Sequence, residues 1–151
     1  MKTRNPWFLI AAAGSFAIAL LHLVIIFIGA SAYRFFGAGE GMATHAEAGS
    51  LTPAVITLVI VFVFVVFGLY SLSAAGVVKR LWKLKPILMA ITAIYLLRGF
   101  GFFVDSIGDI FEHDVRHAVF SFTSFAIGIF HLAGLIRGWK SLSVRGTESA
   151  V

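Results

Sequence analysis

Residues 59–67 read Val-Ile-Val-Phe-Val-Phe-Val-Val-Phe, without one polar side chain. A strand of a membrane β-barrel would alternate apolar and polar residues along such a stretch. Its β-branched residues would favour a strand in water, but inside a bilayer each backbone N–H must find a partner within its own segment, as it does in an α-helix. The stretch therefore predicts a helix surrounded by hydrocarbon.

The composition of the whole chain agrees with this environment. Of its 151 residues, 60% are hydrophobic and 13% are charged, whereas a soluble domain is about half apolar and about a quarter charged. The chain has no cysteine, which excludes disulfides, thiol nucleophiles and thiolate metal sites. Soluble globular and disordered proteins are excluded as well.

Four segments are long and apolar enough to cross a bilayer, which takes about 20 residues. They are residues 7–33, 52–78, 86–104 and 115–137. Prolines stand only near the starts of the first three, where a missing N–H breaks no helical hydrogen bond. We therefore expect an all-α polytopic membrane protein, a four-transmembrane-helix bundle that forms a single domain over residues 1–151.

The charged residues predict the orientation of these spans. Basic residues gather in the amino tail, between the second and third spans and at the carboxyl end, namely Lys2, Arg4, Lys79, Arg80, Lys83, Lys85, Arg137, Lys140 and Arg145. The opposite side has Arg34 and Arg116 and most of the acids, namely Glu40, Glu47, Asp105, Asp109, Glu112 and Asp114. By the positive-inside rule both termini face the cytoplasm, which makes the inner membrane the expected location.

The same charges bear on partners. Since the basic residues are spread over three segments, they do not form the basic face that nucleic-acid binding requires, and we expect no nucleic-acid partner. Contact with anionic lipids of the bilayer is the better interpretation.

The amino-terminal segment has a competing interpretation as a cleaved signal peptide. Lys2 and Arg4 precede an apolar run that ends near Ala30-Ser31-Ala32, a small-residue pattern typical of a cleavage site. The run is longer than the usual 7–15 residues, and His22 interrupts it. We expect it to remain as the first span.

Two other stretches deserve a prediction. The connection between the first two spans contains Gly37, Gly39 and Gly41, and we expect it to be flexible.

Residues 68–74 (Gly-Leu-Tyr-Ser-Leu-Ser-Ala) align with residues 128–134 (Gly-Ile-Phe-His-Leu-Ala-Gly). The similarity fits either a parallel repeat of a helical hairpin or convergence on a common composition.

Small and polar residues recur at coiled-coil spacing in each span. In the second span they are Ala54, Thr57, Val61, Phe64, Gly68, Ser71 and Ala75. In the fourth they are His117, Ser121, Ser124, Gly128, His131, Leu135 and Gly138. Membrane helices associate through small residues and hydrogen bonds, so we expect these stripes to face other helices.

Ionisable residues within the spans are the candidates for a functional site. At 1.5 Å per residue, Arg98 and His22 lie at similar depth in the outer half of the bilayer. Tyr95, Thr57, Ser121 and Ser124 come from roughly that level. These residues form the expected intramembrane polar site. His131 lies nearer the cytoplasm, and we expect it to have a neighbourhood of its own.

The chemistry of this site has two interpretations. No Asp or Glu lies in the middle of a span. The chain therefore lacks the intramembrane carboxylate that a coupled cation exporter needs to bind its cation. An arginine with histidines and hydroxyls suits an anion or a neutral polar group. The structural alternative is that Arg98 reaches the outer headgroups or pairs with Asp105, while the other residues form a static hydrogen-bonded bundle.

A second, weaker candidate is an outer metal site. His113 and His117 have the i, i+4 spacing with which a helix can hold zinc or copper, Asp109 lies four residues before His113, and His45 lies on the same side of the membrane. A solvated polar connection explains the same residues. Haem between His22 and His131 is disfavoured by their difference in depth, about 10 Å by helix arithmetic, and we predict no cofactor.

These features favour a non-catalytic accessory or oligomer-forming membrane subunit, which packs against further copies of itself or against other membrane subunits. The alternative is a small channel or transporter for an anionic or polar solute, with Arg98 and His22 in the pathway. A membrane enzyme or redox protein with metal or haem at the histidines is a third hypothesis, and we expect the chain not to be an enzyme.

Overall fold

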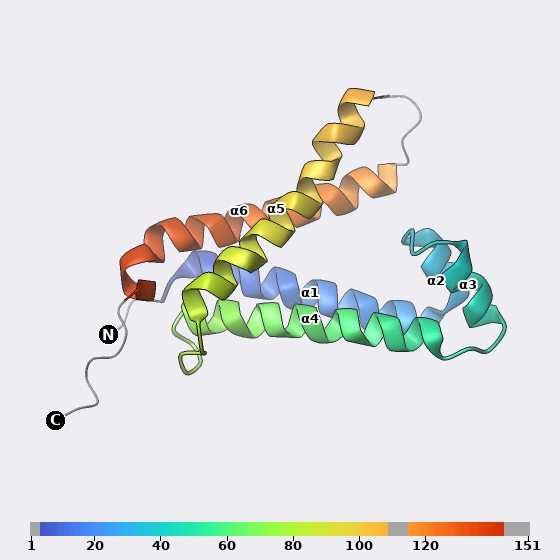
Figure 1. Cartoon of the computed structure of the whole chain (residues 1–151), viewed down its shortest axis with the longest axis horizontal. Coiled ribbons are helices and arrows are strands. Elements are labelled where there is room, and N and C mark those ends of the chain that lie inside the picture. Colours follow the sequence, from blue (N-terminus) through green and yellow to red (C-terminus); the bar gives the residue numbers. More distant parts are fainter. Residues whose placement is uncertain (1–3, 109–114, 144–151) are drawn as a thin grey trace. The chain divides into compact units, whose positions relative to one another are not determined.

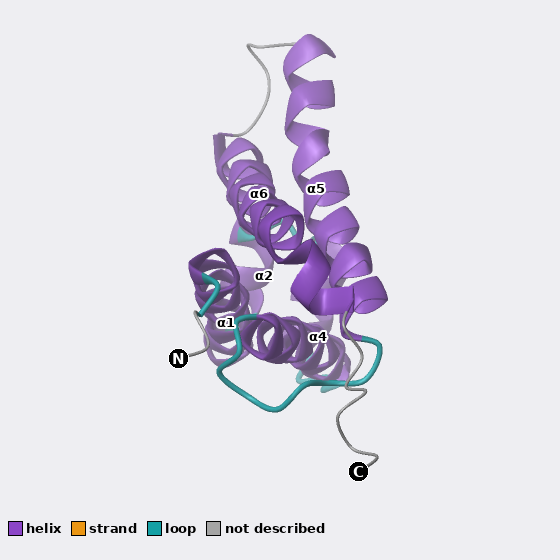
Figure 2. Cartoon of the chain, turned by 90° about the vertical axis from the view of Figure 1, so that its left-hand side faces the viewer, coloured by secondary structure: helices purple, strands orange, loops and turns teal. Residues whose placement is uncertain are grey.

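The computed structural model describes residues 4–108 and 115–143. Within these ranges, it describes the backbone but not the side chains of residues 102–108, 115 and 117. Six helices account for most of this part of the chain: α1 (Pro6–Ile28), α2 (Ala30–Phe35), α3 (Glu40–Glu47), α4 (Thr52–Ala74), α5 (Leu84–Gly108) and α6 (Val115–Ser143) (Figure 1). The described residues contain no strand (Figure 2). The expected all-α fold is confirmed.

Four of these helices are long and apolar enough to cross a membrane. The qualifying segments are Pro6–Ile28, Thr52–Ala74, Leu84–Gly101 and Ala118–Ser143. They correspond to the four predicted spans. The prolines also stand as expected, because Pro6, Pro53 and Pro86 lie in the first turns of α1, α4 and α5.

The first predicted span is shorter in the structure than in the sequence interpretation. Gly29 has a φ of 81°, a backbone conformation that interrupts an α-helix and that glycine adopts without steric cost. The chain therefore leaves α1 at Ile28 and begins the short helix α2 at Ala30. The expected flexible connection is likewise wrong in part, since α2 and α3 occupy much of it.

The second span also ends earlier than predicted. After Ala74 the N–H of Gly76 donates to the Ser73 carbonyl and that of Val77 donates to the Leu72 carbonyl. With Gly76 at a φ of 78°, this is a Schellman motif, which satisfies the last carbonyls of a helix. Residues 75–83 are therefore a connection, although Val77 and Val78 are apolar.

The chain divides into two compact units. Unit 1 comprises Met1–Ala13 and Phe67–Val151, and unit 2 comprises Gly14–Val66. The described part of unit 1 thus contains the start of α1, the end of α4, and the helices α5 and α6. Unit 2 contains the rest of α1, the helices α2 and α3, and the first part of α4.

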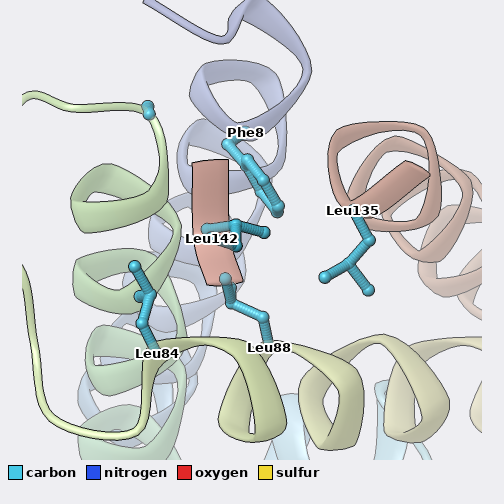
Figure 3. Close-up of a cluster of buried hydrophobic side chains, with 6 residues drawn as sticks. Phe8, Leu84, Leu88, Leu135 and Leu142 are labelled. Atoms are coloured by element: carbon cyan, nitrogen blue, oxygen red, sulfur yellow. The ribbon is translucent and has the colours of Figure 1, made fainter. Parts of the chain in front are cut away.

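Unit 1 has a core of large apolar side chains near the start of α1. Phe8 and Leu88 have no exposed surface, and the other members are Ala75, Leu84, Leu135 and Leu142 (Figure 3). Unit 2 has a smaller core of Ile25, Ala32, Tyr33 and Ala43. That core packs α2 and α3 against the end of α1.

The predicted stripes are confirmed as the buried sides of their helices. In α4, Thr57, Val61, Gly68 and Ser71 are buried. In α6, Ser121, Gly128, His131 and Leu135 are buried. Between the buried residues of α4, positions 58–60, 62, 63 and 69 are exposed and apolar, whereas positions 64–67 are half-buried.

The helices α5 and α6 pack closely at two glycines. A Cβ atom on Gly99 would lie 2.6 Å from the backbone of Phe125, and one on Gly128 would lie 2.8 Å from the side chain of Leu96. At Gly99 the neighbouring backbone leaves no room for a methyl group, so this position requires glycine for packing, whereas at Gly128 the closest atoms belong to a leucine side chain.

We expect Gly99→Ala to destabilise the α5–α6 pair by about 1–3 kcal/mol, the usual cost of overpacking. The measurement is reversible unfolding in mixed detergent micelles. Gly101→Ala is the matched control, because a Cβ there meets no atom of the described residues within 4 Å. If both variants unfold alike, the close approach of α5 and α6 is not what holds this pair together.

Candidate functional site

The most enclosed polar side chain of unit 1 is that of His131, in α6. It has no exposed surface, and neither has Ser71, in α4. The Nε2 atom of His131 lies 2.9 Å from the Ser71 hydroxyl oxygen, and its Nδ1 atom lies 3.0 Å from the carbonyl oxygen of Ile127. One imidazole therefore links two helices and its own preceding turn.

Aromatic rings enclose this imidazole. Tyr95, in α5, stacks on it with ring centroids 5.2 Å apart and an interplanar angle of 23°. Phe8, in α1, meets it edge-on at 6.4 Å, and Phe67, in α4, packs against Tyr95 at 5.8 Å. Side chains from all four long helices thus meet around His131, within unit 1.

The hydrogen bonds of this cluster can be counted. Besides its contact with His131, the Ser71 hydroxyl lies 2.8 Å from the Phe67 carbonyl oxygen. The two nitrogens of His131 and this second contact of Ser71 make three polar contacts, which need three hydrogens. A neutral imidazole and one hydroxyl supply two. With a neutral imidazole, two hydrogens are therefore shared among the three contacts.

This geometry joins two predicted residues and corrects one expectation. Tyr95 was expected at the level of Arg98, with His131 elsewhere, and that separation is wrong. Counted from the predicted cytoplasmic ends of their spans, the two Cα atoms differ in depth by only about 5 Å. Long aromatic side chains bridge such a difference easily.

Ser71 is the member of the cluster that the predicted site omitted. It stands on the predicted stripe of the second span, and it aligns with His131 in the two similar stretches 68–74 and 128–134. These signals place it facing another helix. They do not by themselves reveal that the partner is a histidine.

The remaining predicted residues of unit 1 lie on different surfaces. Arg98 is exposed on α5, beside the exposed residues Ile94 and Leu97. Ser121 is buried and Ser124 is half-buried, both in α6. No hydrogen bond or ion pair joins Arg98 to another residue in the part of the chain that the structure describes.

Two predicted residues belong to unit 2, where each has its own partners. The buried Thr57 hydroxyl donates to the Pro53 carbonyl at 2.8 Å and lies 3.4 Å from the Tyr33 hydroxyl. His22 is half-buried, with Nδ1 2.8 Å from the Ile18 carbonyl oxygen and its ring 5.4 Å from that of Phe64. Both residues thus bond mainly to their own helices.

An ion-pair cluster that the sequence did not predict lies between α2 and α3. The Arg34 guanidinium donates to Glu40 at 2.6 Å and to Glu47 at 2.5 Å. These hydrogen bonds from Arg34 hold the pKa of each carboxyl below its usual range. The same bonds, accepted first by Glu40 and then by Glu47, raise the pKa of Arg34. The three charges lie on the surface and fasten α3 to α2.

The predicted outer metal site lies largely outside the described residues. This applies to Asp109 and His113 and to the side chain of His117. His45 is exposed on α3. Among the described residues, no three His, Cys, Asp or Glu side chains come together as metal ligands.

Comparisons with protein-family models, with curated proteins and with solved structures find no match to this chain. The site is therefore interpreted from its own geometry. In unit 1 that geometry is a closed polar contact between helices, walled by aromatic rings.

We expect Ser71 and His131 to be energetically coupled. In a double-mutant cycle of Ser71→Ala and His131→Phe, which keeps a ring beside Tyr95, the coupling energy should be about 0.6–1.7 kcal/mol, the range for hydrogen bonds between membrane helices. Unfolding in mixed micelles measures it.

The control for this cycle pairs His131→Phe with Thr123→Ala. Thr123 is exposed, and its hydroxyl donates to the Val119 carbonyl of its own helix at 2.8 Å. This pair should show no coupling. Equal coupling in the two cycles would contradict a specific bond between α4 and α6.

Proposed function

We propose that this chain is an accessory or oligomer-forming subunit of the inner membrane, without catalytic activity of its own. In this proposal its four apolar helices cross the bilayer, with both termini and residues 75–83 on the cytoplasmic side. Its partners are further copies of itself or spans of other membrane proteins.

The polar interior of unit 1 supports a structural role. His131 and Ser71 bond to each other and to backbone carbonyls, and the buried Thr92 hydroxyl donates to the Leu88 carbonyl at 2.7 Å. Polar groups engaged in this way rigidify a helix bundle.

The observation that carries the proposal is the exposure of Arg98. It lies within a membrane-crossing segment, and its neighbours Ile94 and Leu97 are 51% and 74% exposed. A charged arginine at a helix centre costs about 2.5–3.5 kcal/mol on insertion scales. A polar or acidic group on a neighbouring span would offset this cost, so the α5 surface around Arg98 is the expected contact with a partner.

The alternative is a small channel or transporter for an anionic or polar solute. The outward position of Arg98 favours a pathway between copies of the chain, since four helices enclose little space. In that alternative, substitution of Arg98 or of His22 stops solute flux in proteoliposomes but leaves assembly intact.

Residues 75–83 should be cytoplasmic, and α3 should face the opposite side of the membrane. Because the chain has no native cysteine, Lys83→Cys and His45→Cys report on exposure without background. An impermeant maleimide should label His45→Cys in intact cells and Lys83→Cys only after permeabilisation. Labelling of Lys83→Cys in intact cells would overturn the orientation.

The partner surface should be detectable by crosslinking. A photoreactive phenylalanine at Leu97, beside Arg98, should form adducts heavier than the 16.3 kDa chain, and Arg98→Leu should abolish them because the charge that selects the partner is gone. Native membranes analysed by gel electrophoresis and mass spectrometry give the measurement.

The control places the same crosslinker at Phe122, an equally apolar and exposed position on α6 that is 61% accessible. Its adducts should not depend on Arg98. Adducts at Leu97 that survive Arg98→Leu, or no adducts there at all, would contradict the proposal. Loss of solute flux with adducts unchanged would favour the channel.

A further inference from the structure

One end of unit 1 carries nearly all of its cations. We call it the basic end, formed by the start of α1, residues 75–83, the start of α5 and the end of α6. Its cationic residues are Arg4, Lys79, Arg80, Lys83, Lys85, Arg137 and Lys140. Among the described residues of unit 1 the one acid is Asp105, in the last turn of α5. The basic end thus has no carboxylate among its described residues.

Several of these cations have partners other than carboxylates. The Lys85 ammonium lies 3.4 Å from the centroid of Trp139 and donates to the Ser143 hydroxyl at 2.7 Å. Arg80 donates to the carbonyls of Ser141 and Leu142, at the carboxyl end of α6. These contacts hold the cations in place and leave their positive charges uncompensated.

At the corner between α1 and α6, Arg137 stacks on an aromatic ring. Its guanidinium lies 4.9 Å from the centroid of Trp7, whose ring also stacks on Phe130 with centroids 6.1 Å apart. A guanidinium held by its face keeps its N–H donors at the edge. No hydrogen bond joins these donors to another residue that the structure describes.

A second donor at this corner also lacks an acceptor. The indole Nε1 of Trp7 is buried and has no hydrogen-bond partner among the described residues. A buried donor left in this state is costly. Because this N–H is enclosed by the protein, it can report on changes at the corner but is not open to an outside ligand.

Lys140 adds a further cation to the same corner. It follows Arg137 by three residues on α6, a spacing that makes neighbours on a helix surface, and it is exposed. The corner itself is fixed, because the Asn5 side-chain amide of α1 donates to the Gly134 carbonyl of α6 at 3.2 Å. An acceptor bound here would meet donors that are already in place.

The surroundings indicate that this acceptor carries hydrocarbon. Ile10 on α1 and Ile136 on α6 are 47% and 68% exposed, each within a turn of Trp7 or Arg137. A ligand that fits both the cations and the adjacent apolar helix surface has an anionic group and a hydrocarbon chain. A lipid has both, whereas a free anion has only the charge. Indole rings and basic residues also prefer the headgroup level of a bilayer.

We propose that the α1–α6 corner binds the phosphate of an anionic phospholipid, with the exposed Arg137 and Lys140 as its cations and the Trp7 ring as the support that positions the Arg137 guanidinium. A zwitterionic headgroup carries a cation of its own, which the cations of the basic end would repel. The basic end should therefore prefer an anionic headgroup. This inference rests on the proposed placement in a membrane, because only there does the corner meet lipid.

The test uses the full chain, delipidated in a neutral detergent, with the Trp7 indole N–H resonance as the readout. Trp7→Phe assigns that resonance. Dioleoylphosphatidylglycerol should shift it saturably, about tenfold more tightly than dioleoylphosphatidylcholine, and Arg137→Gln should weaken the phosphatidylglycerol effect about tenfold. Native mass spectrometry should show the corresponding loss of retained lipid.

Lys83→Gln is the matched control, since it removes the same charge from the same end, where Lys83 contacts Trp82 at 4.3 Å. It should change lipid affinity less than about twofold, within ordinary surface electrostatics. Lys140→Gln, at an exposed position, provides a second variant that should fold normally and bind less tightly.

Three outcomes would overturn the assignment. Equal affinity for the two lipids would remove the preference for anionic headgroups, and an equal loss in Lys83→Gln would indicate diffuse charge. Saturation by inorganic phosphate alone would indicate a free-anion site. None of these outcomes changes maleimide labelling or crosslinking at Leu97, so failure here is distinguishable from failure of the proposed function.

Discussion

In the bilayer that we propose surrounds the four apolar helices, a polar group cannot form a hydrogen bond with water, and this constraint accounts for the hydrogen bonding within those helices. The backbone of residues 59–67 satisfies it by forming the helix α4, although the same residues would favour a strand in water. Side chains satisfy it through helix carbonyls: Thr57, Ser71 and Thr92 each donate to the carbonyl four residues before them. His131 follows the same rule with Ile127.

The spans and their buried sides were predictable from the sequence because both depend on one-dimensional patterns. Hydropathy located the four long helices, and the spacing of small residues located Gly68, Ser71, Gly128 and His131 on buried faces. The sequence patterns did not reveal features that depend on the backbone conformation of a single residue or on contacts between long side chains. The break at Gly29 requires a positive φ, and the Arg34 cluster requires two carboxylates brought near by α3.

The site was predicted less well than the fold, for a related reason. Depth along a helix axis groups residues by Cα height, but a ring such as that of Tyr95 extends well beyond its own Cα. The contact between Ser71 and His131 also needs the two helices to face each other with a particular rotation. These two residues align in the similar stretches 68–74 and 128–134. A contact between equivalent positions is what a rotationally related pair of helices produces.

The cations of the two candidate surfaces differ in what surrounds them, and this separates their roles. At the basic end, Arg137, Lys85 and Arg80 are held by indole rings and helix carbonyls, which fix their positions and retain their charges. Such charges fit a headgroup layer that supplies phosphates at high density. Arg98 has apolar neighbours and lies within the apolar segment Leu84–Gly101 of α5. In our two proposals, therefore, arginine binds lipid at one end of unit 1 and contacts a partner chain on α5.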